Sequence, residues 1–188
     1  GESVFAFGAG GVILQSVDKG AKWVQLESPT TTDLRASDST EAVYNPFTND
    51  LSENGSFAVV GDDGAAYLLA AGSDAWQNIS LESAVDFRGV AMTSATSLVA
   101  IGPSGAIWHY QGGTWTERDS EVTADLNDVS FLDSNLGMIV GDSGTILATN
   151  DGGENWDVRE PPEELVADIV ALDYYSGIRA YAITDKGN

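Results

Sequence analysis

The chain has 188 residues, a length typical of a single domain. It carries 29 acidic against 8 basic side chains, and the net charge of −21 argues against a protein that binds nucleic acid or inserts into an anionic membrane. With no cysteine and one histidine, it has no disulfides, thiolate metal sites or multi-histidine metal sites, and no apolar run reaches the length of a membrane-spanning helix.

The acidity is that of a folded chain rather than a disordered one. Apolar residues make up 43% of the sequence, enough for a hydrophobic core. An acid-rich chain with three lysines (Lys19, Lys22 and Lys186) resembles proteins of salt-loving organisms, in which concentrated cations screen the repulsion. An ordinary acidic surface domain is the alternative. Calcium binding is not predicted, because the chain lacks a D-x-[DN]-x-[DN]-G loop.

Along the chain, an apolar run followed by a small turn recurs five times. The turn has the form Gly-x-x-Gly at residues 8–11, 61–64, 102–105 and 141–144, with a variant at residues 184–187. The last glycines of these turns are spaced by 53, 41, 39 and 43 residues. Self-similarity at this period is typical of a repeat protein.

Two further markers keep the same register. A tryptophan lies 10 or 12 residues after each of the first four turns, at Trp23, Trp76, Trp115 and Trp156. An aspartate opens each following segment, at Asp33, Asp86, Asp125 and Asp168. We therefore divide the single domain, residues 1–188, into units at 1–32, 33–85, 86–124, 125–167 and, incomplete, 168–188.

Each unit is predicted to contain four short strands. In the fourth unit these are residues 126–132, 137–140, 145–149 and 156–159, separated by turns rich in Gly and Asp. Four strands in about 40 residues is the period of a β-propeller blade, so we predict an all-β propeller of four-stranded antiparallel blades. The insertion near residues 45–55 is predicted to be a surface loop, and residues 161–167 to form a helical turn at most.

Two segments resemble a known family. Ser16, Asp18, Gly20 and Trp23 match the Asp-box pattern Ser/Thr-x-Asp-x-Gly-x-x-Trp, and Thr149, Asp151, Gly153 and Trp156 match it again. The chain resembles the bacterial neuraminidase repeat propellers, especially the photosystem II assembly and stability factor group, whose repeat resembles residues 140–156. For these eight residues we expect a structural role, with the carboxylate accepting backbone N–H bonds and the tryptophan packing between sheets.

Arg35 and Arg88 are the candidate ligand-binding residues. They lie two residues after Asp33 and Asp86, and neighbouring blades could present them together to an anion. The alternative is that they pair with nearby carboxylates. The equivalent positions in the next units are Asn127 and Val170, so the arginine cluster of a sialidase is not predicted. No catalytic residue, cofactor or metal site is predicted, and the lone His109 is expected at a surface or an edge.

These observations predict a non-catalytic propeller that binds a protein partner or helps to assemble or stabilise a complex. The alternative is a glycan-binding or sialidase-type propeller, which would expose aromatic residues on one face, whereas a scaffold would bury all five tryptophans. Four to five blades are expected, as part of a larger ring, an open array, or a ring completed by another chain in a homo-oligomer. The family resemblance implies an extracytoplasmic or cell-surface location.

Overall fold

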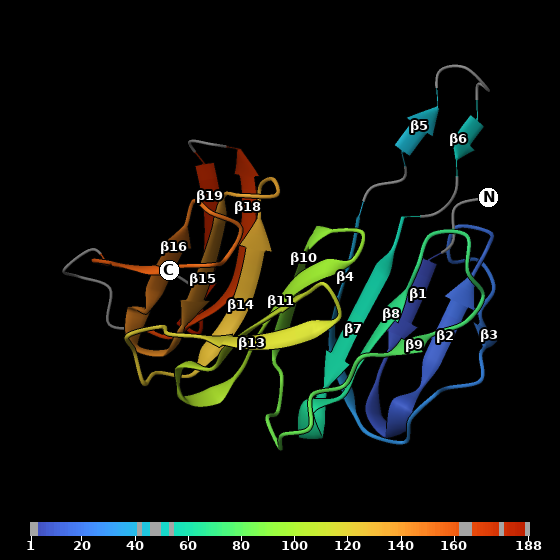
Figure 1. Cartoon of the computed structure of the whole chain (residues 1–188), viewed down its shortest axis with the longest axis horizontal. Helices are drawn as coiled ribbons and strands as arrows, with labels where there is room; N and C mark the ends of the chain where they lie inside the picture. Colours follow the sequence, from blue (N-terminus) through green and yellow to red (C-terminus); the bar gives the residue numbers. More distant parts are fainter. Residues whose placement is uncertain are drawn as a thin grey trace.

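The computed structural model describes residues 4–40, 43–45, 50–52, 55–161, 167–176 and 179–186, and this part of the chain consists of β-strands joined by turns (Figure 1). The all-β prediction is confirmed. Among these described residues, no helix is long and apolar enough to cross a membrane.

The described strands form five sheets that follow one another along the chain and one separate two-stranded hairpin, and the middle three of the five each have four antiparallel strands. The first sheet has three strands, β1 (Val4–Phe7), β2 (Ile13–Ser16) and β3 (Val24–Gln25). The second contains β4 (Leu34–Ser39), β7 (Phe57–Gly61), β8 (Ala66–Leu69) and β9 (Gln77–Asn78). The third contains β10 (Gly89–Ser94), β11 (Ser97–Ile101), β12 (Ile107–Gln111) and β13 (Thr114–Arg118).

The fourth and fifth sheets continue the series. The fourth contains β14 (Leu126–Phe131), β15 (Gly137–Gly141), β16 (Ile146–Thr149) and β17 (Asp157–Arg159), each within one residue of its predicted bounds. The fifth contains β18 (Ile169–Ser176) and β19 (Arg179–Thr184). Consecutive sheets contact each other through β1 and β4, β4 and β10, β10 and β14, and β14 and β18. Figure 1 shows the resulting arc, from the first sheet in blue to the fifth in red.

The insertion of the second unit differs from its prediction. The expected surface loop contains a short ladder between β5 (Val43–Asn45) and β6 (Asp50–Ser52), which are paired antiparallel. In Figure 1 this hairpin projects beyond the second sheet. Residues 46–49 and 53–54 of the insertion, like residues 162–166 of the predicted helical turn, lie outside the described residues.

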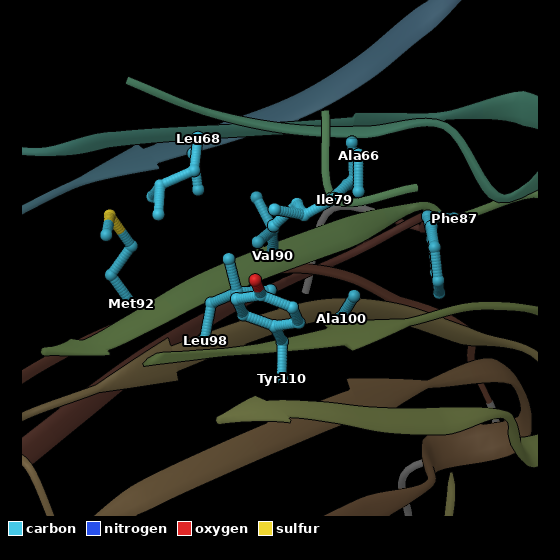
Figure 2. Packing of buried hydrophobic residues seen from close by; sticks show 11 residues of the cluster. Ala66, Leu68, Ile79, Phe87, Val90, Met92, Leu98, Ala100 and Tyr110 are labelled. Carbon is cyan, nitrogen blue, oxygen red and sulfur yellow. The ribbon is translucent and has the colours of Figure 1, made fainter. Parts of the chain in front are cut away.

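The core lies between neighbouring sheets. Figure 2 shows the cluster between the second and third sheets, where Leu68 of β8 faces Met92, Leu98 and Tyr110 of the next sheet. A second cluster joins the third and fourth sheets through Val99, Ile139 and other buried residues. Each sheet therefore depends on its neighbours for burial of its apolar side chains, as expected for a repeat architecture.

Three of the repeat tryptophans contact the sheet that precedes their own. Trp76 packs edge-on against Phe5 and Phe7 of the first sheet. The indole N–H of Trp115 donates to the backbone oxygen of Ile79, which directly follows β9 of the second sheet. Trp156 is 5% exposed and belongs to the cluster shared with the third sheet.

The prediction of burial is wrong for Trp23, which is 43% exposed. Trp23 belongs to the first sheet, and within the described ranges no sheet precedes it. The physical reason for the error is that the burial of a repeat tryptophan depends on the neighbouring unit and not on its own unit. The expectation that a scaffold buries all five tryptophans is therefore not met.

The aspartates that open the units hold the Gly-x-x-Gly turns of the preceding sheets. The turns contain the 3-10 segments η1 (Ala9–Gly11), η2 (Asp62–Gly64), η3 (Pro103–Gly105) and η4 (Asp142–Gly144). One carboxylate oxygen accepts a backbone N–H from the middle residue of each segment, pairing Asp33 with Gly10, Asp86 with Asp63, Asp125 with Ser104, and Asp168 with Ser143 at 2.8–3.1 Å. The aspartate register in the sequence thus corresponds to a repeated clip between sheets.

Candidate functional site

The Asp box of the fourth sheet is a closed hydrogen-bonded hairpin between β16 and β17. The Thr149 hydroxyl donates to Asp151 Oδ1 at 2.8 Å and accepts the backbone N–H of Gly153 at 3.1 Å. Asp151 Oδ1 also accepts the backbone N–H groups of Glu154 and Asn155. Although burial opposes the change, the hydrogen bonds from Asn155, Thr149 and Glu154 lower the pKa of Asp151 to about 2.

The Asp box of the first sheet repeats this geometry. The Ser16 hydroxyl donates to Asp18 Oδ1 at 2.9 Å and accepts the backbone N–H of Gly20 at 2.8 Å. Asp18 Oδ1 accepts the backbone N–H of Lys22, and this bond lowers the pKa of Asp18. In both boxes the carboxylate accepts hydrogen bonds from its own hairpin, so its role is to stabilise the turn.

Arg35 and Arg88 lie at the opposite end of the sheets from the Asp boxes, beside the Gly-x-x-Gly turns. They line one shallow depression together with Asp62, Asp86 and Phe87. The sequence therefore located two side chains that the structure brings together.

Both guanidinium groups are already paired with carboxylates. Arg35 donates from Nε and Nη2 to the two oxygens of Asp62 at 2.9 and 2.7 Å, and also lies 3.3 Å from Asp33. The hydrogen bond from Arg35 lowers the pKa of Asp62. Arg88 lies 2.9 Å from Asp125. An anionic ligand at this depression would have to compete with these carboxylates.

His109 is buried, so the prediction of a surface or edge position is wrong. It lies on β12 and is 3% exposed, because the Asp-box hairpin of the fourth sheet covers it. Its Nδ1 is 3.1 Å from Glu154 Oε1, and Arg118 reaches the other Glu154 oxygen at 2.6 Å. Burial lowers the pKa of His109, and the nearby Glu154 opposes that effect in part.

Ser97 completes the buried network around His109. Its hydroxyl oxygen is 3.1 Å from His109 Nε2 and accepts a hydrogen bond from Thr93. A serine at Nε2 of a histidine and a carboxylate at its Nδ1 also form the catalytic triad of serine hydrolases. However, Ser97 is only 5% exposed, which leaves no access for a substrate, so the arrangement is a structural network between two sheets.

Sequence reasoning missed two acids that bridge the first strands of neighbouring sheets. Asp38 of β4 accepts the backbone N–H of Met92 in β10, and Asp128 of β14 accepts that of Leu172 in β18, both at 2.7 Å. Edge strands need partners for such N–H groups. Burial raises the pKa of both acids, against the effect of these hydrogen bonds. The available signal was an aspartate inside each of these two first strands.

A pocket of about 270 Å³ opens between the first and second sheets, at the end that carries the Asp boxes. Phe5 and Phe57, whose rings meet edge-on with centroids 4.8 Å apart, line it together with Trp76. Ser73 and Asp74 of the hairpin between β8 and β9 also line it. Within the described part of the chain, no group of three or more histidine or acidic side chains is arranged to hold a metal ion.

Comparison with known proteins places this arc of sheets among the β-propellers. A solved structure of YCF48 bound to a D1 peptide aligns with 98% of this chain and 58% of that chain, with a TM-score of 0.72 and 17% identity. A more distant neighbour, an ancestral GH74 enzyme, aligns with 87% of this chain and 24% of that chain, with a TM-score of 0.57 and 16% identity. At these identities the likeness concerns the fold alone.

The sequence resembles one group of these propellers in particular. The family model described as "Photosynthesis system II assembly factor YCF48" matches residues 109–175. The photosystem II assembly lipoprotein Ycf48 of Synechococcus sp. (strain CC9605) is 36% identical over 62 residues, which are 32% of this chain and 19% of that relative. The chain thus matches about a fifth of that relative's length. The predicted resemblance to Asp-box propellers of the photosystem II assembly-factor group is confirmed.

Proposed function

We propose that this chain is a non-catalytic β-propeller module that binds a protein partner and helps to assemble or stabilise a complex. The observation that carries the proposal is the match of residues 109–175 to the assembly-factor family model. The matched relative from Synechococcus is named an assembly lipoprotein, not an enzyme. The buried Ser97 and His109 are consistent with a protein that does no chemistry on a substrate.

The partner is proposed to be a segment of another protein. The structural neighbour YCF48 is described as bound to a D1 peptide, so a protein of this fold accepts a peptide. Propellers offer rigid faces built from turns, which suit such recognition. The depression lined by Arg35 and Arg88 is the candidate contact for an anionic group of the partner protein. That group would replace Asp62 and Asp125 in the ion pairs of the two guanidinium groups.

A glycan-binding or sialidase-type role is not proposed. Trp23 is exposed, but Trp76, Trp115 and Trp156 contact the preceding sheets, so these three aromatic side chains are used in packing. Nothing in the described residues supports a second copy of the chain as partner. The naming of the matched relative as a lipoprotein supports an extracytoplasmic location. The finer assignment to a cell surface is proposed from the family resemblance, and the salt-rich habitat is proposed from the composition.

The test is partner capture followed by measured binding. Cross-linking and mass spectrometry identify the partner, and overlapping peptides of that partner are then titrated by fluorescence anisotropy. We expect one peptide to bind, and the double variant Arg35→Ala/Arg88→Ala to weaken it by about tenfold. Arg159→Ala is the matched control, because Arg159 is exposed and pairs with Asp157 on β17 of the fourth sheet, outside the depression. Absence of binding by every peptide, or turnover of a glycoside, would contradict the proposal.

A further inference from the structure

The pocket between the first and second sheets lies beside a degenerate Asp box. At the positions of Thr149, Asp151 and Gly153, the second unit has Leu69, Ala71 and Ser73. The hairpin between β8 and β9 therefore lacks the carboxylate that organises the intact boxes.

The equivalent place in the fourth sheet is closed. A Cβ atom on Gly153 would lie 2.8 Å from Val99 Cγ2 of the preceding sheet, so the intact box packs directly on its neighbour. In the second sheet Ser73 stands at this position and lines the pocket instead. The loss of the box sequence and the presence of a cavity thus coincide at the same interface.

The lining of the pocket combines aromatic side chains with one carboxylate. Phe5, Phe57 and Trp76 line it, and none of the three is fully buried. Asp74 lies on the exposed hairpin, and within the described ranges its carboxylate has no ion-pair partner. Aromatic faces and a carboxylate together attract a cation, and a guanidinium group can also stack on the rings.

We propose that this pocket binds a cationic side chain, an arginine, of the protein partner. The inference rests on the proposed function, because it names the chemistry of that partner. Two observations favour this occupant. The volume of about 270 Å³ lies below the usual range of sites for small organic ligands and suits a single side chain. The net charge of −21 favours the approach of a basic segment.

The test is a titration of the whole chain with N-acetyl-arginine methylamide. Binding is monitored by NMR at the indole N–H signal of Trp76. N-acetyl-citrulline methylamide, which has the same shape without the charge, is the matched ligand. We expect the arginine compound to shift the Trp76 signal and to bind about threefold to fivefold more tightly than the citrulline compound. Asp74→Asn should weaken the binding of the arginine compound by about the same factor.

Glu117→Gln is the matched control variant, because it removes one negative charge from an exposed position on β13 of the third sheet. It should leave the binding unchanged. Equal binding of the two compounds, equal effects of the two variants, or an unmoved Trp76 signal would each overturn the proposal. The titration uses no protein partner, so its result is independent of partner capture. The pocket proposal can therefore be overturned while the proposed function is supported, and the proposed function can be overturned while the pocket proposal is supported.

Discussion

The Nδ1 atom of His109 lies 3.1 Å from the Glu154 carboxylate and thereby joins the third strand of one sheet to the Asp-box hairpin of the next. Burial lowers the pKa of His109 below the ordinary value of 6.5. Below pH 6.5 the unfolded chain therefore binds a proton at this residue more readily than the folded chain does. The contribution of His109 to the free energy of unfolding falls as the pH decreases from 6.5 toward its folded-state pKa.

The first prediction follows from the direction of this pH dependence. Between pH 7.5 and 5, the free energy of unfolding of the natural chain should fall relative to that of His109→Gln, which keeps a polar group of similar length but does not titrate. Urea unfolding at several pH values measures the difference between the two chains. The natural chain and the variant should differ by a constant amount if His109 titrated equally in both states, and that result would contradict the burial effect.

The second prediction concerns Asp38, whose carboxylate accepts the Met92 N–H across two sheets. Burial raises the pKa of Asp38, so the charged carboxylate is less stable in the folded chain than in the unfolded chain. Asp38→Asn keeps an acceptor without the charge and should raise the free energy of unfolding by about 1 kcal/mol. Asp38→Ala should lower it by about 1–2 kcal/mol, because the Met92 N–H then lacks an acceptor.

The control for Asp38 is Asp157→Asn on β17, whose side chain is exposed. Its effect on urea unfolding at pH 7 should stay within about 0.5 kcal/mol. The account of Asp38 fails if the asparagine variant is destabilised as much as the alanine variant, since the carboxylate charge would then contribute to stability.

The third prediction tests the clips between sheets. Asp168 Oδ1 accepts the backbone N–H of Ser143 at 2.8 Å in the turn of the preceding sheet. Asp168→Ala should reduce the free energy of unfolding by about 1 kcal/mol, as the loss of a capping side chain does. Asp168→Asn retains an acceptor and should recover most of that loss. Thermal unfolding followed by circular dichroism compares the two, and equal losses would show that the hydrogen bond to Ser143 contributes nothing.

The sequence predicted the repeat and its strands because the markers that reveal them are local. The Gly-x-x-Gly turn needs a final residue at positive φ, such as Gly144 at 71°, and this requirement leaves a glycine in every complete copy. The four strands of the fourth sheet followed from these turns. Asp168 was recognised as a marker, but its role was not, because its partner Ser143 belongs to the preceding unit.

What the sequence could not show are contacts between units. His109 was expected at the surface because its own strand says nothing of Glu154, which is brought over it by the next sheet. Trp23 was expected in the core for the converse reason, since its burial requires a preceding sheet. Arg35 and Asp62 lie within one unit, and pairing with a nearby carboxylate was the alternative expected for Arg35, but repeat spacing did not identify Asp62 as the partner.

The last prediction concerns the Asp-box glycine of the fourth sheet. Gly153 has a φ of +89°, and a Cβ atom there would lie 2.8 Å from Val99 Cγ2. Gly153→Ala thus combines backbone strain with a clash against the preceding sheet, and should lower the free energy of unfolding by about 2–4 kcal/mol. Gly112, with a φ of +60° and no atom within 4 Å of such a Cβ, supplies the matched control.

Gly112→Ala imposes the backbone cost without the clash and should lower the free energy of unfolding by about 1 kcal/mol. Urea unfolding of the two variants separates the two contributions, and relief of the Gly153→Ala loss by Val99→Ala would assign the excess to the contact between sheets. If both glycine variants lost the same stability, the box would be held by its own hairpin alone, and its packing on the preceding sheet would not explain why glycine stands at this position.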